Sequence, residues 1–212
     1  MTDVIAAVEE NRRGALISME SGEKLWLSRE ALCEHAALRP GDELNLEELK
    51  AWLLPRQYPE ALNTAVALLA QQARASGEIR KKLERKPYLE DTIDMVLYKL
   101  EKEKLLNDQE FAREWAASRA RCQVGRNRIL QELLQKGVDR DTARMALEEM
   151  NEEEKEEAAV ALACRLVKRH AKETDERKAM NKVLMAMARR GYCYDESRCA
   201  IEKALLQMEE EA

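Results

Sequence analysis

The segment Ile129–Leu147, ILQELLQKGVDRDTARMAL, has the pattern of two short amphipathic helices separated by a glycine. Apolar residues recur at helical spacing on both sides of Gly137, and glycine is the residue that most often follows the end of a helix. Lys136 complements the negative end of the first helix, and Asp141 lies where the positive end of the second is expected. The segment therefore predicts a helix, a tight corner and a second helix.

The same pattern occurs twice more, beginning at Ile79 and at Val183, so the three copies are spaced by 50 and then 54 residues. The predicted corners are at Pro87, Gly137 and Gly191. Each copy follows another amphipathic segment, so each repeat is expected to contain three helices. One such unit buries little surface alone, and stacking of neighbouring units supplies the rest of the core.

The first 58 residues have a different pattern. Short β-branched runs alternate with turn residues, which predicts a three-stranded β-meander. Helices are expected after the capping residues Ser28 and Asn45, and Pro55 and Pro59 are expected to break the chain. The predicted fold is mainly α, with three tandem three-helix repeats in an elongated array after a small α+β N-terminal module. The expected parts are residues 1–58, 59–106, 107–150, 151–207 and an acidic C-terminal tail, 208–212.

Composition excludes several classes of protein. The net charge of −5 argues against a protein that mainly coats nucleic acid, although residues 61–150 carry 17 Lys and Arg against 15 Asp and Glu. Five scattered cysteines and two histidines predict neither a disulfide framework nor a metal site. Apolar spans and a secretory leader are not evident, so we expect a cytoplasmic protein. No catalytic or nucleotide-binding motif is present, which predicts a non-enzyme without a cofactor.

Arginines are concentrated just before and within the middle repeat, where Glu114 is the only acid between residues 113 and 128. They are Arg113, Arg119, Arg121, Arg126 and Arg128. Lys81, Lys82, Arg85 and Lys86 of the first repeat could extend this group, as could Arg189 and Arg190 of the third. One interpretation is a solvated helix face that pairs with glutamates elsewhere. The other is a binding surface for phosphates or for an acidic protein, which the planar guanidinium group recognises well.

Phe111 and Trp115 are four residues apart, so a base-stacking platform is one interpretation of this pair. Apolar residues at helical spacing more often form the core, and we predict a core role here. Gly125 is expected to be a structural corner, as are Pro87, Gly137 and Gly191.

The middle of the chain resembles the RecX family, bacterial regulators of the RecA recombinase. The shared residues are Asp108, Phe111, Ala112, Trp115, Arg119, Gly125, Arg128, Ile129, Glu132, Leu133, Lys136 and Gly137. The resemblance covers about residues 61–205 and is most specific in the middle repeat. The N-terminal module is similar to the extension of some longer family members.

The resemblance implies a non-enzymatic protein that docks along RecA–DNA filaments and modulates, most simply inhibits, the recombinase and its ATPase. It also implies roles in DNA repair, recombination and the SOS response. The arginines of the middle repeat are then candidates for filament contact, to protein carboxylates or to filament-bound DNA. The acidic net charge favours contact with the protein of the filament over direct contact with DNA. We also expect a monomer that is not attached to a membrane. Two alternatives stay open: a DNA-binding module resembling a helix-turn-helix, and a helical scaffold without a nucleic-acid role.

Overall fold

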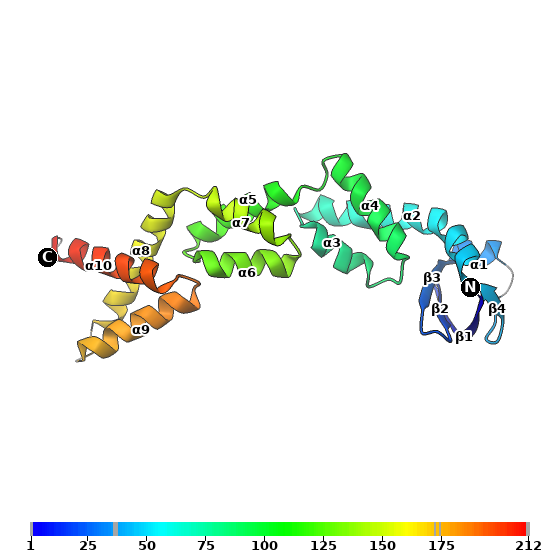
Figure 1. Ribbon diagram of the computed structural model, residues 1–212, viewed down its shortest axis with the longest axis horizontal. Coiled ribbons are helices and arrows are strands. Elements are labelled where there is room, and N and C mark those ends of the chain that lie inside the picture. Colours follow the sequence, from blue (N-terminus) through cyan, green and yellow to red (C-terminus); the bar gives the residue numbers. More distant parts are fainter. Residues whose placement is uncertain (1, 36–37, 172, 174, 211–212) are drawn as a thin grey trace. The chain divides into compact units, whose positions relative to one another are not determined.

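The computed structural model describes residues 2–35, 38–171, 173 and 175–210, which form a small sheet followed by helices (Figure 1). The chain divides into two compact units, residues 1–107 and 108–212. The predicted class, mainly α with a small β-containing module at the N-terminus, is confirmed.

The N-terminal sheet is antiparallel, with the strand order β3-β2-β1-β4. Its strands are β1 (Thr2–Asn11), β2 (Gly14–Met19), β3 (Lys24–Ser28) and β4 (Glu43–Asn45). The meander of three strands is confirmed, but the prediction missed β4, which pairs Thr2 with Asn45 and Val4 with Glu43. A strand of three residues has too little alternation to be recognised from sequence.

Helix α1 (Arg29–Glu34) follows β3, and Ser28 caps it by accepting a hydrogen bond from the amide of Ala31. Helix α2 (Leu46–Gln71) is capped by Asn45 and continues through Pro55 and Pro59, so the predicted break is wrong. A proline inside a helix costs about 3 kcal/mol. Burial on both sides of the prolines, by Leu53 on one side and Ala61 on the other, opposes that cost.

Gln57 joins the sheet to the first repeat from within α2. Its buried side chain donates to the carbonyl of Trp26 at 2.7 Å and accepts from the amide of Leu89 at 2.9 Å and the hydroxyl of Thr92 at 3.3 Å. The Trp26 ring also packs in the core of the first repeat. The N-terminal module and the first repeat therefore share one compact unit, and the expected boundary at residue 58 falls inside α2.

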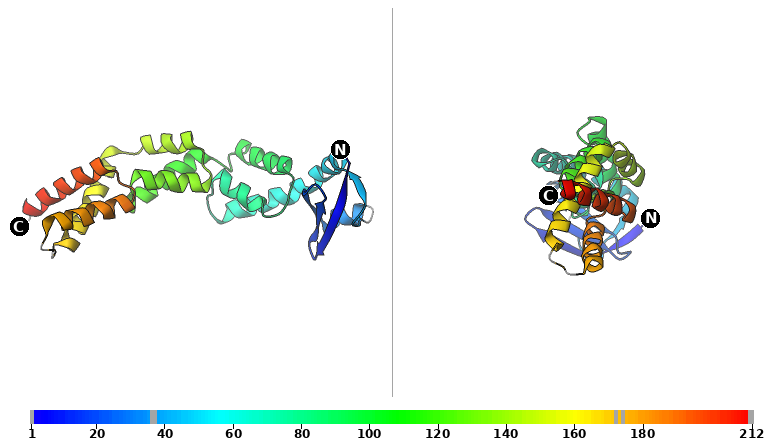
Figure 2. Two further views of the ribbon diagram at one scale, coloured as in Figure 1. Left: turned by 60° about the horizontal axis from the view of Figure 1, so that its bottom comes forward. Right: turned by 90° about the vertical axis from the view of Figure 1, so that its left-hand side faces the viewer.

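The helices fall into three successive groups along the chain, and Figure 2 gives two further views of them. The C-terminal half of α2 is followed by α3 (Ser76–Leu83) and α4 (Glu90–Lys102). The second group is α5 (Asp108–Arg121), α6 (Arg126–Lys136) and α7 (Arg140–Glu148). The third is α8 (Glu152–His170), α9 (Glu176–Arg189) and α10 (Tyr194–Glu210).

Equivalent positions of the three repeats are buried in each copy. Ile79, Ile129 and Val183 are at most 2% exposed, and the positions four residues later are all 0% exposed. Those later positions are Leu83, Leu133 and Met187. The period read from the sequence therefore marks the core of every repeat.

Two of the predicted corners, Gly137 and Gly191, lie where the middle helices of the second and third repeats end. Gly137 ends α6 in the left-handed conformation, with φ of 83°, and Gly191 follows α9 with φ of 94°. The tail expected at residues 208–212 continues α10 as far as Glu210, and residues 211–212 lie outside the described residues. Among the helices of the described ranges, none combines the length and apolar character needed to cross a bilayer.

Candidate partner-binding surface

Arg119, on α5, is held in place by Glu132 of α6. The guanidinium group donates two hydrogen bonds to the carboxylate, Nε to Oε2 at 2.7 Å and Nη2 to Oε1 at 2.9 Å. The Trp115 indole and Arg128 Nε lie 3.3 Å and 3.4 Å from the same carboxylate. Because the two side chains of the central pair are 30% and 18% exposed, this pair joins α5 to α6 and is poorly available to a partner.

The electrostatics of Glu132 follow from these contacts. Partial burial alone would raise its pKa, but the hydrogen bonds from Arg119, Arg128 and Trp115 outweigh burial and lower the pKa below its usual value. The carboxylate is therefore ionised wherever the protein is folded near neutral pH, and it satisfies positive charge from two helices.

Two further arginines of the predicted group also pair within the second repeat. Arg113 forms an ion pair with Glu149, with Nη2 at 3.2 Å from Oε1, and Arg126 lies 3.9 Å from Glu148. These side chains are roughly half exposed, and surface pairs of this kind contribute about 0–1 kcal/mol and exchange partners readily. Arg121 is exposed and forms no ion pair or side-chain hydrogen bond within the described residues.

The cations predicted from the first repeat lie in the first unit. Lys81 and Lys82 are in α3, and Arg85 follows that helix. Arg85 lines a hollow beside the sheet in which acids and bases are mixed: Glu9, Glu10, Arg13 and Lys86 line it too. These three residues belong to a different unit from the five arginines, so no single surface is defined for all eight.

The aromatic pair of α5 is mainly structural. Phe111 is buried, as predicted, and its ring stacks on Trp115 with centroids 6.0 Å apart. Lys136 lies against both rings, with Nζ 4.1 Å from the centroid of the Trp115 ring and 5.6 Å from that of the Phe111 ring. The burial of Phe111 confirms its predicted core role, whereas Trp115 is only half-buried.

Gly125 and Gly191 bring the second and third repeats together through their backbones. The Gly125 amide donates to the Arg190 carbonyl at 2.8 Å, and the Asn127 amide donates to the Gly191 carbonyl at 3.1 Å. A Cβ on Gly125 would lie 2.4 Å from the carbonyl carbon of Gly191. A Cβ on Gly191 would lie 2.4 Å from the Cβ of Arg128. Gly125 was predicted as a corner, and it is also an inter-repeat contact.

A basic hollow lies on the α6–α8–α9 side of this junction, with a volume of about 400 Å³. Five arginines line it, and Leu162, Leu166 and Ala186 complete its wall. The arginines are Arg128 of α6, Arg165 and Arg169 of α8, Arg189 of α9 and the adjoining Arg190. We call these five side chains the arginine hollow; no carboxylate lines it.

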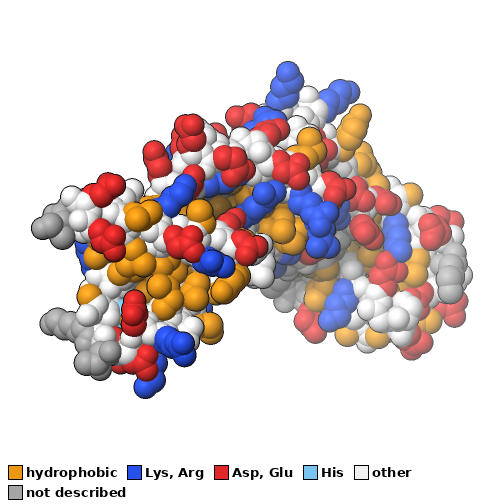
Figure 3. Space-filling model, turned by 60° about the vertical axis from the view of Figure 1, so that its left-hand side comes forward, with side chains coloured by type: hydrophobic (Ala, Val, Ile, Leu, Met, Phe, Trp, Pro, Cys, Tyr) orange, Lys and Arg blue, Asp and Glu red, His pale blue; other side chains and the backbone are white. Residues whose placement is uncertain are grey.

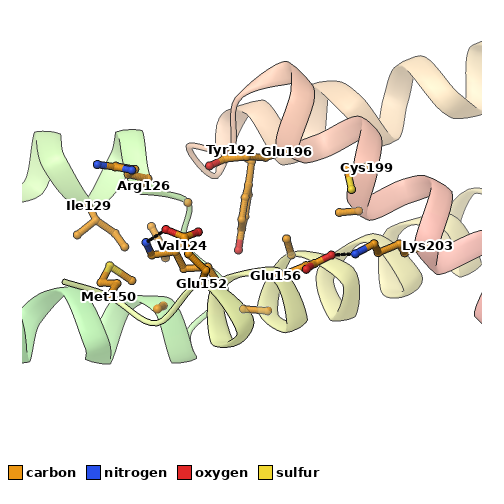
Figure 4. A pocket seen from close by; sticks show the side chains of 16 residues that line it. Val124, Arg126, Ile129, Met150, Glu152, Glu156, Tyr192, Glu196, Cys199 and Lys203 are labelled. Carbon is orange, nitrogen blue, oxygen red and sulfur yellow. Dashed lines mark hydrogen bonds and ion pairs between the residues drawn. The ribbon is translucent and has the colours of Figure 1, made fainter. Parts of the chain in front are cut away.

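An apolar pocket of about 400 Å³ lies at the same junction, between α6, the start of α8, and α10 (Figure 4). The ring of Tyr192 extends into it, and burial raises the pKa of this tyrosine to about 12. Four of the charges along its rim are paired with one another, Lys203 with Glu156 and Lys155 with Glu152. The pocket therefore offers a ligand mainly apolar contact, because the charges of these two ion pairs are already satisfied.

Hydrophobic side chains also gather on one face of the third repeat (Figure 3). The side chains that pack only partly against the core there include Val167, Met180, Leu184 and Leu205. The described residues contain no group of three or more His, Cys, Asp or Glu side chains that could hold a metal ion. The five cysteines are free thiols, including Cys193 and Cys199.

Sequence reasoning missed Arg165 and Arg169, which complete the arginine hollow. They are four residues apart on α8, and this spacing places both on one face of the helix. That signal was present in the segment CRLVKRH, but the convergence with Arg128 and Arg189 depends on how the third repeat packs on the second.

Comparison with known proteins identifies the family. The family model described as RecX, first three-helix domain, matches residues 61–100, and the model described as RecX, second three-helix domain, matches residues 107–147. A protein from Amycolatopsis mediterranei named Regulatory protein RecX is 36% identical over 137 residues, which are 64% of this chain and 78% of the relative. The chain belongs to the RecX family.

Other RecX proteins support the same assignment. Regulatory protein RecX of Clostridioides difficile is 30% identical over 169 residues, covering 79% of each chain. The solved structure of RecX from Lactobacillus salivarius superposes with a TM-score of 0.67 at 26% identity, over 72% of this chain and 99% of that one. A second structure, of a regulatory protein RecX, has a TM-score of 0.64 at 23% identity over 95% and 99% of the two chains, and it supports the fold.

Proposed function

We propose that this chain regulates RecA recombinase by binding the RecA–DNA filament and slowing its ATP hydrolysis, as a cytoplasmic monomer acting in DNA repair and recombination. The observation that carries the proposal is the match of two RecX family models to two consecutive repeats, in a chain whose relatives are named regulatory proteins. A regulator of this kind acts by binding, and this agrees with the absence of a catalytic motif from the sequence.

Repeated surface residues support a partner that is itself repetitive. Met95 of α4 and Met145 of α7 occupy equivalent positions 50 residues apart, and they are 45% and 53% exposed. Methionine side chains adapt to irregular protein surfaces and are frequent at binding sites. Two repeats that present the same apolar side chain suit a filament built from identical subunits.

The exposed cations of the second repeat are the polar part of the proposed contact. Arg121 has no internal partner among the described residues, and Arg126 has only a distant one, Glu148 at 3.9 Å. Arg113 can exchange its surface pair for a partner carboxylate at little cost. Arg119 is assigned a structural role, because Glu132 already satisfies its guanidinium group.

The test is single-stranded-DNA-dependent ATP hydrolysis by RecA from the same organism, titrated with the chain. The wild type is expected to lower the rate, and Arg121→Glu with Arg126→Glu to require at least about tenfold more protein, because two attractive charges become repulsive. Arg177→Glu with Arg198→Glu is the matched control, since both are exposed arginines of the same unit on helices of the third repeat, outside the proposed contact. No inhibition by the wild type at any ratio would contradict the proposal.

The two alternatives give different results in the same assay. A DNA-binding module that acts without RecA would compete for the single strand, so its inhibition would disappear when DNA is in large excess. A scaffold with another partner would not change the rate at all. The net charge of −5 favours protein contact as the principal mode.

A further inference from the structure

We infer that the arginine hollow is a phosphate-binding site that takes consecutive phosphodiester groups of a single-stranded nucleic acid. The hollow lies on the surface of the second unit, where α6, α8 and α9 meet, and it brings five guanidinium groups around a volume of about 400 Å³. This site is distinct from the protein contact proposed above, and it does not depend on RecA.

Three of the five arginines have no partner in the described chain. The side chains of Arg165, Arg169 and Arg189 make no ion pair and donate no hydrogen bond to any described residue. Their positive charge is therefore available to a ligand.

The other two arginines are oriented by backbone carbonyls at the repeat junction. Arg128 Nη1 donates to the Arg189 carbonyl at 3.2 Å, and Arg190 Nη1 donates to the Cys122 carbonyl at 3.5 Å. Arg128 also lies 3.4 Å from Glu132, a carboxylate that Arg119 already satisfies. These contacts hold the two guanidinium groups in position, and Glu132 neutralises part of the charge of Arg128 but not that of Arg165, Arg169 or Arg189.

Helix-end electrostatics account for only part of this arrangement. Arg169 and Arg189 lie in the last turns of α8 and α9, where a cation is favourable. Arg165 lies one turn earlier, four residues from Arg169, and like charges at this spacing destabilise a helix. An arginine pair that costs stability and has no internal partner is typical of a binding site.

The chemistry of the hollow selects the ligand. Guanidinium groups bind phosphate oxygens in bidentate geometry, and a nucleic-acid backbone carries its negative charges at short, regular intervals. No aromatic residue lines the hollow, so it has no side chain on which a base would stack. We therefore expect contacts to the backbone, with little dependence on base sequence and strong dependence on salt.

The experiment is fluorescence anisotropy of labelled oligothymidylate, titrated with the full chain over a series of salt concentrations without RecA. The wild type is expected to bind, and Arg165→Ala with Arg169→Ala to weaken binding about tenfold at low salt. The log–log salt slope should fall by about 1.4, because each phosphate contact on a single strand contributes about 0.7. Arg144→Ala with Arg177→Ala removes the same charge elsewhere on the unit and should leave both quantities unchanged.

Competitors identify the source of the bound charge. Unlabelled oligoadenylate should displace the probe as well as oligothymidylate does, since bases are not read. Displacement by pyrophosphate at the same phosphate concentration would overturn the backbone assignment in favour of a free phosphate ligand. Displacement by polyglutamate alone would assign the hollow to an acidic protein segment instead.

Two further outcomes contradict the inference. The first is unchanged binding by the Arg165→Ala, Arg169→Ala variant, and the second is no binding of oligothymidylate by a folded wild type. Circular dichroism and thermal unfolding establish that the variants are folded. Because RecA is absent from this assay, its result is independent of the ATPase result.

Discussion

The second unit contains two groups of arginines that differ in their surroundings. On α5, Arg119 shares a carboxylate with Arg128, and Arg113 pairs with Glu149. In the arginine hollow, Arg165 and Arg169 form no ion pair with a carboxylate of the described residues, and none of the described acids lines the hollow. The number of arginines in a segment is therefore a poor guide to binding, and the acids that the fold brings from other helices decide which cations stay available.

A substitution at the contact between the second and third repeats should have the largest effect on the free energy of unfolding. This contact also positions Arg128 between the arginines of α5 and those of the arginine hollow. Gly191→Ala should destabilise the second unit by about 2–4 kcal/mol, since alanine there combines left-handed strain with a close approach to Arg128. Gly22→Ala is the matched control: its φ is +91° but the space around it is open, so only the strain of about 1 kcal/mol is expected. Urea denaturation measures both, and equal losses would mean that the junction is loosely packed.

Removing the Glu132 carboxylate, which Arg119 and Arg128 share, should have the next largest effect on the free energy of unfolding. Glu132→Ala leaves Arg119 and the Trp115 indole without their acceptor, and a loss of about 1–3 kcal/mol in the free energy of unfolding is expected. Chemical denaturation of the variant checks this. A loss below about 0.5 kcal/mol, the range of ordinary surface substitutions, would show that the α5–α6 pair is not structural.

Substitutions in the arginine hollow, in contrast to Glu132→Ala, should not lower the free energy of unfolding. Arg165→Ala with Arg169→Ala is expected to leave the free energy of unfolding unchanged within about 0.5 kcal/mol, or to raise it, because no internal pair is lost and a repulsive one is removed. The same denaturation experiment, run beside Glu132→Ala, makes the comparison direct. If the double variant were as unstable as Glu132→Ala, the hollow would be part of the scaffold.

The pH dependence of stability gives a smaller and more specific test. The pKa of Glu132 is lower in the folded protein than its usual value of 4.5, so its contribution is complete above that pH and is lost as the pH falls through the folded pKa. Glu132→Gln should therefore flatten the stability profile below about pH 4.5. Glu148→Gln is the control, because this carboxylate is exposed and 3.9 Å from its partner. An identical slope in wild type and Glu132→Gln would contradict the pairing.

The repeats could be predicted from the sequence because their signals are local. The apolar period marked Ile79, Ile129 and Val183, and the glycines marked the corners at residues 137 and 191. Each of these features depends on residues within one or two turns of the same helix.

The failures involve interactions between distant residues. Pro55 and Pro59 lie inside a helix that is held by burial of Leu53 and Ala61 and by hydrogen bonds from Gln57 to Trp26 and Leu89, and local propensity does not reveal these long-range contacts. The arginine hollow was missed for the same reason, because Arg165 and Arg128 meet only after the third repeat packs on the second. The predicted role of the middle-repeat arginines in partner binding remains a proposal for Arg121 and Arg126, whereas Arg119 is hydrogen-bonded to Glu132.

The most direct test of the difference between paired and unpaired arginines is residue-resolved modification by a guanidinium-specific dicarbonyl reagent, followed by mass spectrometry, with and without oligothymidylate. We predict that Arg165, Arg169 and Arg189 react rapidly in the free chain and are protected by the oligonucleotide. Arg119 should react slowly under both conditions. Equal reactivity of Arg119 and Arg165 in the free chain, or no protection of the hollow by the oligonucleotide, would contradict the account.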